Sequence, residues 1–323
     1  MKVNVCPEYR GTLAKVFLPH TGDDFRDAYL ERAGESLRQA GSEIKYVDVP
    51  KMSGIFSLLP NEMDSYSLWL RDPCIFLGYD DGKKPVVLMT DDVVLYTNGT
   101  AKDISDKCIM REHLEDAGAE VIEAPFFVVG GDCLITEQEA IFGWLTAQLN
   151  GWGYGNHERG TREVRKVLDK FELDAVFLDD VGKTDKNMYD YRRLNGFFHL
   201  DTVASFLPGK NAVVSETLRQ ITTRDNQGYE NYVTETLDKH GYKVLRAPAV
   251  LTNSYLWSPT NVLVDESKKI IFLSKMAGDE EINSAAAGTY SKLGYRVQFI
   301  DVNPEIHEQK GGVRCLSFAI KSE

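Results

Sequence analysis

One repeated junction constrains the fold of this chain more than any other feature of its sequence. Five times, a helix-like stretch ends at a turn and leads directly into an apolar strand-like stretch. In four of the five copies the turn carries a glycine: Gly41, Gly118, Gly241 or Gly294. Glycine just past a helix end adopts the left-handed conformation at little cost, so these positions predict helix ends. The third copy, at residues 171–174, lacks the glycine.

Each junction lies inside a longer repeated unit. Apolar strands open the units at residues 15–18, 85–89, 140–144, 211–214 and 270–274, and second strands follow at residues 44–50, 121–125, 175–178, 244–248 and 297–302. Units of about 50–80 residues are too long for a helical solenoid and too rich in helix for four-stranded propeller blades. Closing five units in a ring leaves no strand edge unpaired. We therefore predict a single domain over residues 1–323, an α/β ring with fivefold pseudosymmetry.

The composition narrows the classes of function. Of the 323 residues, 43% are hydrophobic and 27% are charged, as in ordinary globular proteins, and the net charge of −12 argues against nucleic-acid binding. No apolar run has membrane length and the first residues lack a signal-peptide core, so we expect a cytoplasmic protein without a membrane partner. The five cysteines lack metal-ligand spacing, and we expect free thiols, no metal and no cofactor.

Unusual side chains follow the second strand of each unit. The segments are residues 69–73 (Trp-Leu-Arg-Asp-Pro), 129–132 (Val-Gly-Gly-Asp), 198–202 (Phe-His-Leu-Asp-Thr), 253–261 and 312–315 (Gly-Val-Arg-Cys). In a pseudosymmetric ring, residues at the same position of each unit lie at the same distance from the centre. The segments are therefore predicted to converge on one central pocket. We expect Gly311 and Gly312 to turn with φ > 0 and to present Cys315 on a short strand rather than bury it.

Cys315 and His199 together suggest nucleophilic catalysis. A thiolate attacks an electron-poor carbon, and histidine protonates the leaving group and then activates water. On an extended strand His199 and Asp201 would share one face, and Asp72 would add a second anion. Such a negative pocket suits a guanidinium, which pairs bidentately with carboxylates, better than a protease oxyanion. Each residue also has a purely structural interpretation: Cys315 as a buried thiol, His199 as a core histidine and Asp72 as part of a surface ion pair. Catalysis is favoured because these residues occur together at equivalent positions of the repeat.

These residues resemble motifs of the guanidino-group-modifying enzymes of the pentein fold, which include arginine deiminase, dimethylarginine dimethylaminohydrolase, agmatine deiminase and arginine:glycine amidinotransferase. Residues 71–73 (Arg-Asp-Pro), 199–203 (His-Leu-Asp-Thr-Val) and 314–317 (Arg-Cys-Leu-Ser) are similar to family segments that bind the guanidinium and carry the histidine and the nucleophile. The resemblance implies a covalent thiouronium intermediate on Cys315. It also implies that Asp72 and Asp201 hold the guanidinium, while His199 acts as acid and then as base.

The resemblance implies further substrate contacts. Residues 158–161 (Glu-Arg-Gly-Thr) are similar to a segment whose arginine binds the substrate α-carboxylate in some relatives, so Arg159 is a candidate for that role. Arg314 is a second candidate for a ligand carboxylate. Asp132, Trp69 and Asn253 are the remaining predicted substrate-binding residues.

One position departs from the family pattern. Relatives carry an acid before Gly-Gly-Asp, and this chain has Val129. Either two aspartates suffice, or Asp132 or another acid takes the place, or the activity is altered. We expect a hydrolase that releases ammonia or an amine from a small-molecule guanidino substrate, arginine or a derivative, and leaves a ureido product. An amidinotransferase and an inactive ring used for binding stay open as alternatives.

Overall fold

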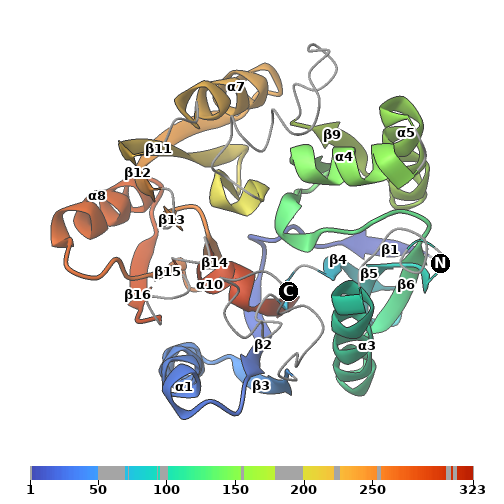
Figure 1. Ribbon diagram of the computed structural model, residues 1–323, viewed down its shortest axis with the longest axis horizontal. Helices are drawn as coiled ribbons and strands as arrows, with labels where there is room; N and C mark the ends of the chain where they lie inside the picture. Colours follow the sequence, from blue (N-terminus) through green and yellow to red (C-terminus); the bar gives the residue numbers. More distant parts are fainter. Residues whose placement is uncertain are drawn as a thin grey trace.

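The protein is a ring of five α/β units. The computed structural model describes residues 2–49, 70, 71, 73–92, 94, 101–153, 156–178, 199–221, 226–252, 256–302, 307 and 311–322. Five small sheets surround a common centre, and helices cover their outer sides (Figure 1). This arrangement confirms the fivefold α/β fold predicted from the repeat.

Each unit contains two antiparallel strands, a helical segment, and a third strand parallel to the second. The first comprises β17 (Phe318–Ser322), β2 (Thr12–His20), α1 (Asp24–Gln39) and β3 (Glu43–Asp48). The second comprises β4 (Cys74–Asp80), β5 (Pro85–Thr90), α3 (Ala101–Asp116) and β6 (Glu120–Ala124), with β1 (Val3–Val5) paired to β4. The third comprises β7 (Cys133–Ile135), β8 (Glu139–Phe142), α4 (Trp144–Gly153), α5 (His157–Leu168) and β9 (Asp174–Phe177).

The last two units follow the same order. The fourth comprises β10 (Ala204–Leu207), β11 (Asn211–Ile221), α7 (Asn226–Lys239), β12 (Lys243–Thr252) and the short β13 (Leu256–Trp257). The fifth comprises β14 (Val262–Asp265), β15 (Ile270–Ser274), α8 (Glu280–Ser291) and β16 (Arg296–Ile300). The predicted strands of all five units therefore lie where the repeat places them, to within a few residues.

The two ends of the chain close the ring together. Strand β17, near the end of the chain, pairs antiparallel with β2, near its beginning, so that Phe318 lies opposite Phe17. The first unit is thus assembled from both termini. Because Cys315 lies three residues before β17, this pairing fixes the segment that carries the predicted nucleophile.

The glycine-marked helix ends have the predicted conformation. Gly41, Gly118, Gly241 and Gly294 have φ between 79° and 93°. In the third unit, where the glycine is missing, Glu172 takes the left-handed conformation instead, with φ of 58°. The turn is therefore required by the unit itself, since a non-glycine residue adopts it despite its steric cost.

Three local predictions are wrong. Residues 199–201 do not form an extended strand, because Leu200–Thr202 make a 3₁₀ turn, η4. Cys315 is not on a strand either: it lies in the single helical turn α10 (Val313–Leu316). The strand expected at residues 140–144 ends earlier, and its last residue starts α4. In the first two cases a distant side chain binds the backbone and sets the turn.

Apolar side chains pack between the sheets and the outer helices. Leu37 of α1 packs with Val16 and Leu18 of β2, and none of the three is more than 1% exposed. Burying a side chain of this size stabilises the fold by about 1.5–3 kcal/mol. Within the described parts of the chain, no helix is both long and apolar enough to cross a membrane.

Candidate active site

Segments that precede the first strands of the units meet near the centre of the ring. They include η1 (Gly130–Asp132) before β7, η4 before β10 and α10 before β17. Their contacts are long-range: Asp201 of η4 touches Cys315 of α10, 114 residues further along the chain. The ring therefore joins side chains from distant parts of the sequence in one cluster.

Cys315 is buried in this cluster, with 4% of its surface exposed. Its Sγ lies 3.5 Å from Oδ2 of Asp201 and 3.7 Å from Oδ1. A ring nitrogen of His199 lies within 4.8 Å of both the sulfur and the Asp201 carboxylate. The prediction that Cys315 is presented rather than buried is wrong, because the turn of α10 packs the thiol against Asp201.

The glycines before Cys315 allow close packing instead of a left-handed turn. Gly312 has an extended φ of −157°, and neither Gly311 nor Gly312 is among the glycines with positive φ, so that prediction is wrong. A Cβ on Gly312 would lie 2.7 Å from Oδ1 of Asn261, closer than real Cβ atoms come to such a neighbour. Glycine is needed here because the Asn261 side chain approaches the backbone.

His199 is a buried base. Burial lowers the pKa of its imidazole from 6.5 to about 4, the Asp201 carboxylate acts in the opposite direction, and the Arg314 guanidinium lowers the pKa further. The imidazole is therefore neutral near pH 7 and can accept a proton. This is the state that a base needs before a thiol is deprotonated.

Asp132 lies between two units and binds backbone. Its Oδ2 accepts a hydrogen bond from the backbone N–H of Thr146 at 2.7 Å, and its Oδ1 accepts one from the N–H of Leu200 at 3.1 Å. Asp132 is fully buried. Burial raises the pKa of its carboxyl to about 8, and the nearby Asp201 charge acts in the same direction, although the hydrogen bonds oppose them. These contacts position the peptide that follows His199.

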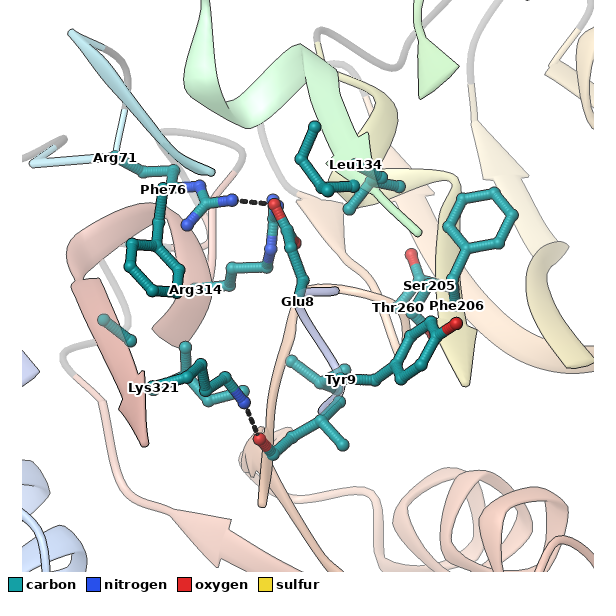
Figure 2. A pocket seen from close by; sticks show the side chains of 15 residues that line it. Glu8, Tyr9, Arg71, Phe76, Leu134, Ser205, Phe206, Thr260, Arg314 and Lys321 are labelled. Carbon is teal, nitrogen blue, oxygen red and sulfur yellow. Dashed lines mark hydrogen bonds and ion pairs between the residues drawn. The ribbon is translucent and has the colours of Figure 1, made fainter. Parts of the chain in front are cut away.

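Arg314 belongs to a buried chain of charges. Its guanidinium donates to Asp201, to Glu8 and to the carbonyl of Cys133, and Glu8 also accepts a hydrogen bond from Arg71. Figure 2 shows the Glu8 carboxylate next to the guanidinium groups of both arginines. Burial opposes the charge of Arg314, but the Glu8 and Asp201 carboxylates outweigh it and raise its pKa. Both terminal nitrogens of Arg314 bind protein acceptors, so a substrate carboxylate would need another cation.

A narrow cavity of about 30 Å³ lies beside this chain of charges. Glu8, Arg71, Arg314 and Lys321 contribute to its lining (Figure 2). The cavity has room for one or two water molecules, far less than a guanidino substrate needs. Cys315 and His199 do not line it, so we do not assign the substrate to this space.

The remaining predicted site residues are Arg159, Trp69, Asp72 and Asn253. Arg159 lies on the outer helix α5, where it is exposed. Trp69, Asp72 and Asn253 lie outside the described residues, although Arg71 and Pro73 on either side of Asp72 are described. Val129, which replaces the acid of the family pattern, is 5% exposed and packs in the largest apolar cluster.

Two residues at the site were not predicted individually from the sequence. Asn261, at the end of the predicted segment 253–261, contacts the sulfur of Cys315: its Nδ2 lies 2.8 Å from Sγ. Its place just before β14 matches that of the other site segments, so the repeat itself could have identified it. Glu8 follows the short strand β1 and has no counterpart in the repeat, and no sequence signal marks it.

The arrangement suits covalent catalysis. A thiol, a neutral imidazole and a carboxylate lie close enough together for proton transfer and nucleophilic attack. The same side chains are also close enough to chelate a cation. Oδ2 of Asp201 already binds the Arg314 guanidinium, and Cys315 and His199 supply a nucleophile and its base, so we assign the cluster to catalysis.

Comparisons with known proteins identify the fold. No protein-family model and no curated protein sequence matches the chain. Its structure is similar to that of agmatine deiminase from C. jejuni, with a TM-score of 0.67 and 14% identity over 99% of this chain and 97% of that one. Agmatine deiminase of Enterococcus faecalis gives a TM-score of 0.67 and 12% identity over 99% and 96% of the two chains.

A third similar structure belongs to another enzyme of the group. Dimethylarginine dimethylaminohydrolase from Pseudomonas aeruginosa, a cysteine-to-serine mutant complexed with citrulline, gives a TM-score of 0.56 and 14% identity over 96% and 100% of the chains. The chain therefore has the fold of the guanidino-group-modifying enzymes, the pentein fold, along essentially its whole length.

Proposed function

We propose that the protein is a cysteine-dependent hydrolase that acts on the guanidinium group of arginine or an arginine derivative. The observation that carries the proposal is the cluster at the ring centre, in which reactive atoms of Cys315, His199 and Asp201 lie within 4.8 Å of one another. The shared fold with two agmatine deiminases and a dimethylarginine dimethylaminohydrolase supports it.

In the first half of the reaction, the Cys315 thiol passes its proton to the neutral imidazole of His199. The thiolate attacks the guanidinium carbon and forms a C–S bond. The imidazolium then donates its proton to the leaving nitrogen, the C–N bond breaks, and ammonia or an amine departs. An amidino thioether stays on Cys315.

In the second half, water attacks the amidino carbon while His199 accepts its proton. A C–O bond forms, the C–S bond breaks, and His199 returns this proton to the sulfur. The ureido product leaves after its remaining extra proton is released to solvent. Asp201 favours this chemistry because its carboxylate attracts the cationic substrate next to the nucleophile. A carboxylate has about four lone-pair sites, so Asp201 can accept a second guanidinium beside Arg314.

Further roles in the proposal rest on the sequence. Asp72 would hold the guanidinium together with Asp201, and Trp69 and Asn253 would contact the remainder of the substrate. We place the protein in the cytoplasm, since all five cysteines are free thiols.

A panel of substrates tests the function. Arginine, methylated arginines, agmatine and an arginyl peptide are incubated with the wild type, with Cys315→Ser and with Cys108→Ser, a control at an exposed cysteine. We expect a ureido product from at least one compound, abolished by Cys315→Ser and retained in Cys108→Ser. Turnover of none of them, or full activity of Cys315→Ser, would refute the proposal. Transfer of the amidino group to added glycine would instead indicate an amidinotransferase.

A further inference from the structure

Both ends of the side-chain amide of Asn261 contact the segment that carries the nucleophile. The residue is 1% exposed and lies just before β14. Its Oδ1 accepts hydrogen bonds from the backbone N–H groups of Arg314 at 2.9 Å and Cys315 at 3.2 Å. Its Nδ2 lies 2.8 Å from Sγ of Cys315. One side chain therefore fixes the backbone of the nucleophile and touches its reactive atom.

The orientation of the Asn261 amide follows from these partners. Two backbone N–H donors face one end of the amide, so that end must be the oxygen. Reversing the amide would place an NH₂ group against two donors and the oxygen against a sulfur rich in lone pairs. The NH₂ group must therefore face Sγ as a donor.

The charges around the sulfur make this donor important. The Asp201 carboxylate, 3.5 Å from Sγ, accepts a hydrogen bond from the thiol and opposes its ionisation. His199 is neutral, and the Arg314 guanidinium is engaged by Asp201 and Glu8. A neutral sulfur is a weak acceptor, whereas a thiolate accepts a strong, charge-assisted hydrogen bond. A donor held at Sγ therefore favours the thiolate.

The repeat places Asn261 in a segment where two other units carry an acid. Asp132 and Asp201 occupy the corresponding segments before β7 and β10. An acid at position 261 would put a second carboxylate on the sulfur, whereas an amide keeps the oxygen that binds the backbone and supplies a donor. Gly312 makes room for this contact, since a Cβ there would collide with Asn261.

We propose that Asn261 is a catalytic residue that donates a hydrogen bond to the Cys315 thiolate and holds the sulfur in position for attack. The inference deepens the proposed function and rests on it for the identity of the nucleophile. Its effect on the sulfur, however, exists without substrate. Thiol reactivity therefore tests it independently of turnover.

The experiment measures alkylation of Cys315 by iodoacetamide as a function of pH, followed by mass spectrometry of the peptide that contains Cys315. Asn261→Asp keeps the shape and the backbone acceptor but removes the donor. Asn261→Ala removes both. Asn283→Ala is the matched control, because Asn283 is also 1% exposed and binds backbone, at Met276, away from the sulfur. Thermal melting of each variant establishes that it is folded.

We expect the alkylation midpoint to rise by about one to two pH units in Asn261→Ala, the effect of one hydrogen bond to a charged group. The rate at neutral pH then falls about 10- to 100-fold, and Asn261→Asp, which adds a charge, falls at least as far. Asn283→Ala should match the wild type. A midpoint unchanged in folded Asn261→Asp would overturn the inference. Failure of the proposed function would appear differently, as absent turnover with the alkylation differences intact.

Discussion

Glu8 is predicted to stabilise the ring centre through its charge. One carboxylate oxygen binds Arg71 and the other binds Arg314, and the two arginine side chains are 5% and 4% exposed. Glu8→Gln keeps the shape of the side chain but replaces one oxygen by an NH₂ group. That group would face a guanidinium, donor against donor. Arg71 would then keep the Gly130 carbonyl as its acceptor, without a carboxylate.

The expected loss of stability is large because the pairs are buried. Removing one partner of a buried ion pair typically costs about 3–5 kcal/mol, since the other charge stays in the interior without compensation. For 323 residues, the unfolding entropy of about 2.1 cal/mol/K per residue amounts to about 0.7 kcal/mol/K. The predicted fall in melting temperature is therefore about 4–7 °C.

Differential scanning calorimetry of Glu8→Gln measures this effect. The matched control is Glu35→Gln, which removes an exposed ion pair with Arg38 at 3.4 Å, the two side chains being 58% and 44% exposed. Exposed pairs contribute at most about 1 kcal/mol, so the control should melt within about 1–2 °C of the wild type. If Glu8→Gln melts as the control does, the carboxylate does not hold the two arginines together.

Two further predictions concern buried bases whose pKa values are lowered. Because the pKa of His199 falls from 6.5 to about 4, the unfolded chain binds a proton that the folded chain excludes, and stability should decline by roughly 3 kcal/mol as pH decreases through this window. Urea unfolding at several pH values should show that the free energy of unfolding of His199→Gln lacks this decline. If the variant's stability falls with pH as steeply as that of the wild type, burial of His199 is not the cause. Burial likewise lowers the pKa of Lys321 from 10.5 to about 8, so wild-type stability should increase by roughly 3 kcal/mol between pH 8 and 10.5. In the same assay, the stability of Lys321→Met should not increase over this pH range. A pH dependence equal to that of the wild type would contradict the prediction.

The fold was predictable because its signals are local and repeated. Each helix end needs a left-handed residue, and four glycines mark it in the sequence. Even the exception, Glu172, lies at the position that the repeat indicates. Closure of the ring was predicted, but the pairing of β17 with β2 that achieves it was not, because no single residue marks it.

The local conformation of the site was not predictable in the same way. Both η4 and α10 are too short to show a period, and distant side chains set their turns. Asp132 binds the N–H of Leu200 from 68 residues away, and Asn261 binds the N–H of Cys315 from 54 residues away. Glu8 reaches Arg314 across 306 residues, a contact that only the closed ring creates. Such contacts exist only once the ring has formed.

Covalent catalysis by Cys315 can be tested by measuring the mass of the enzyme during turnover. The protein is quenched in acid while it reacts with the guanidino compound that it turns over fastest, and the Cys315 peptide is then analysed. We expect an amidino adduct on Cys315 that accumulates in the steady state, disappears when substrate is exhausted, and is missing in Cys315→Ser. Steady turnover with no adduct on Cys315, or an adduct on another residue, would contradict it.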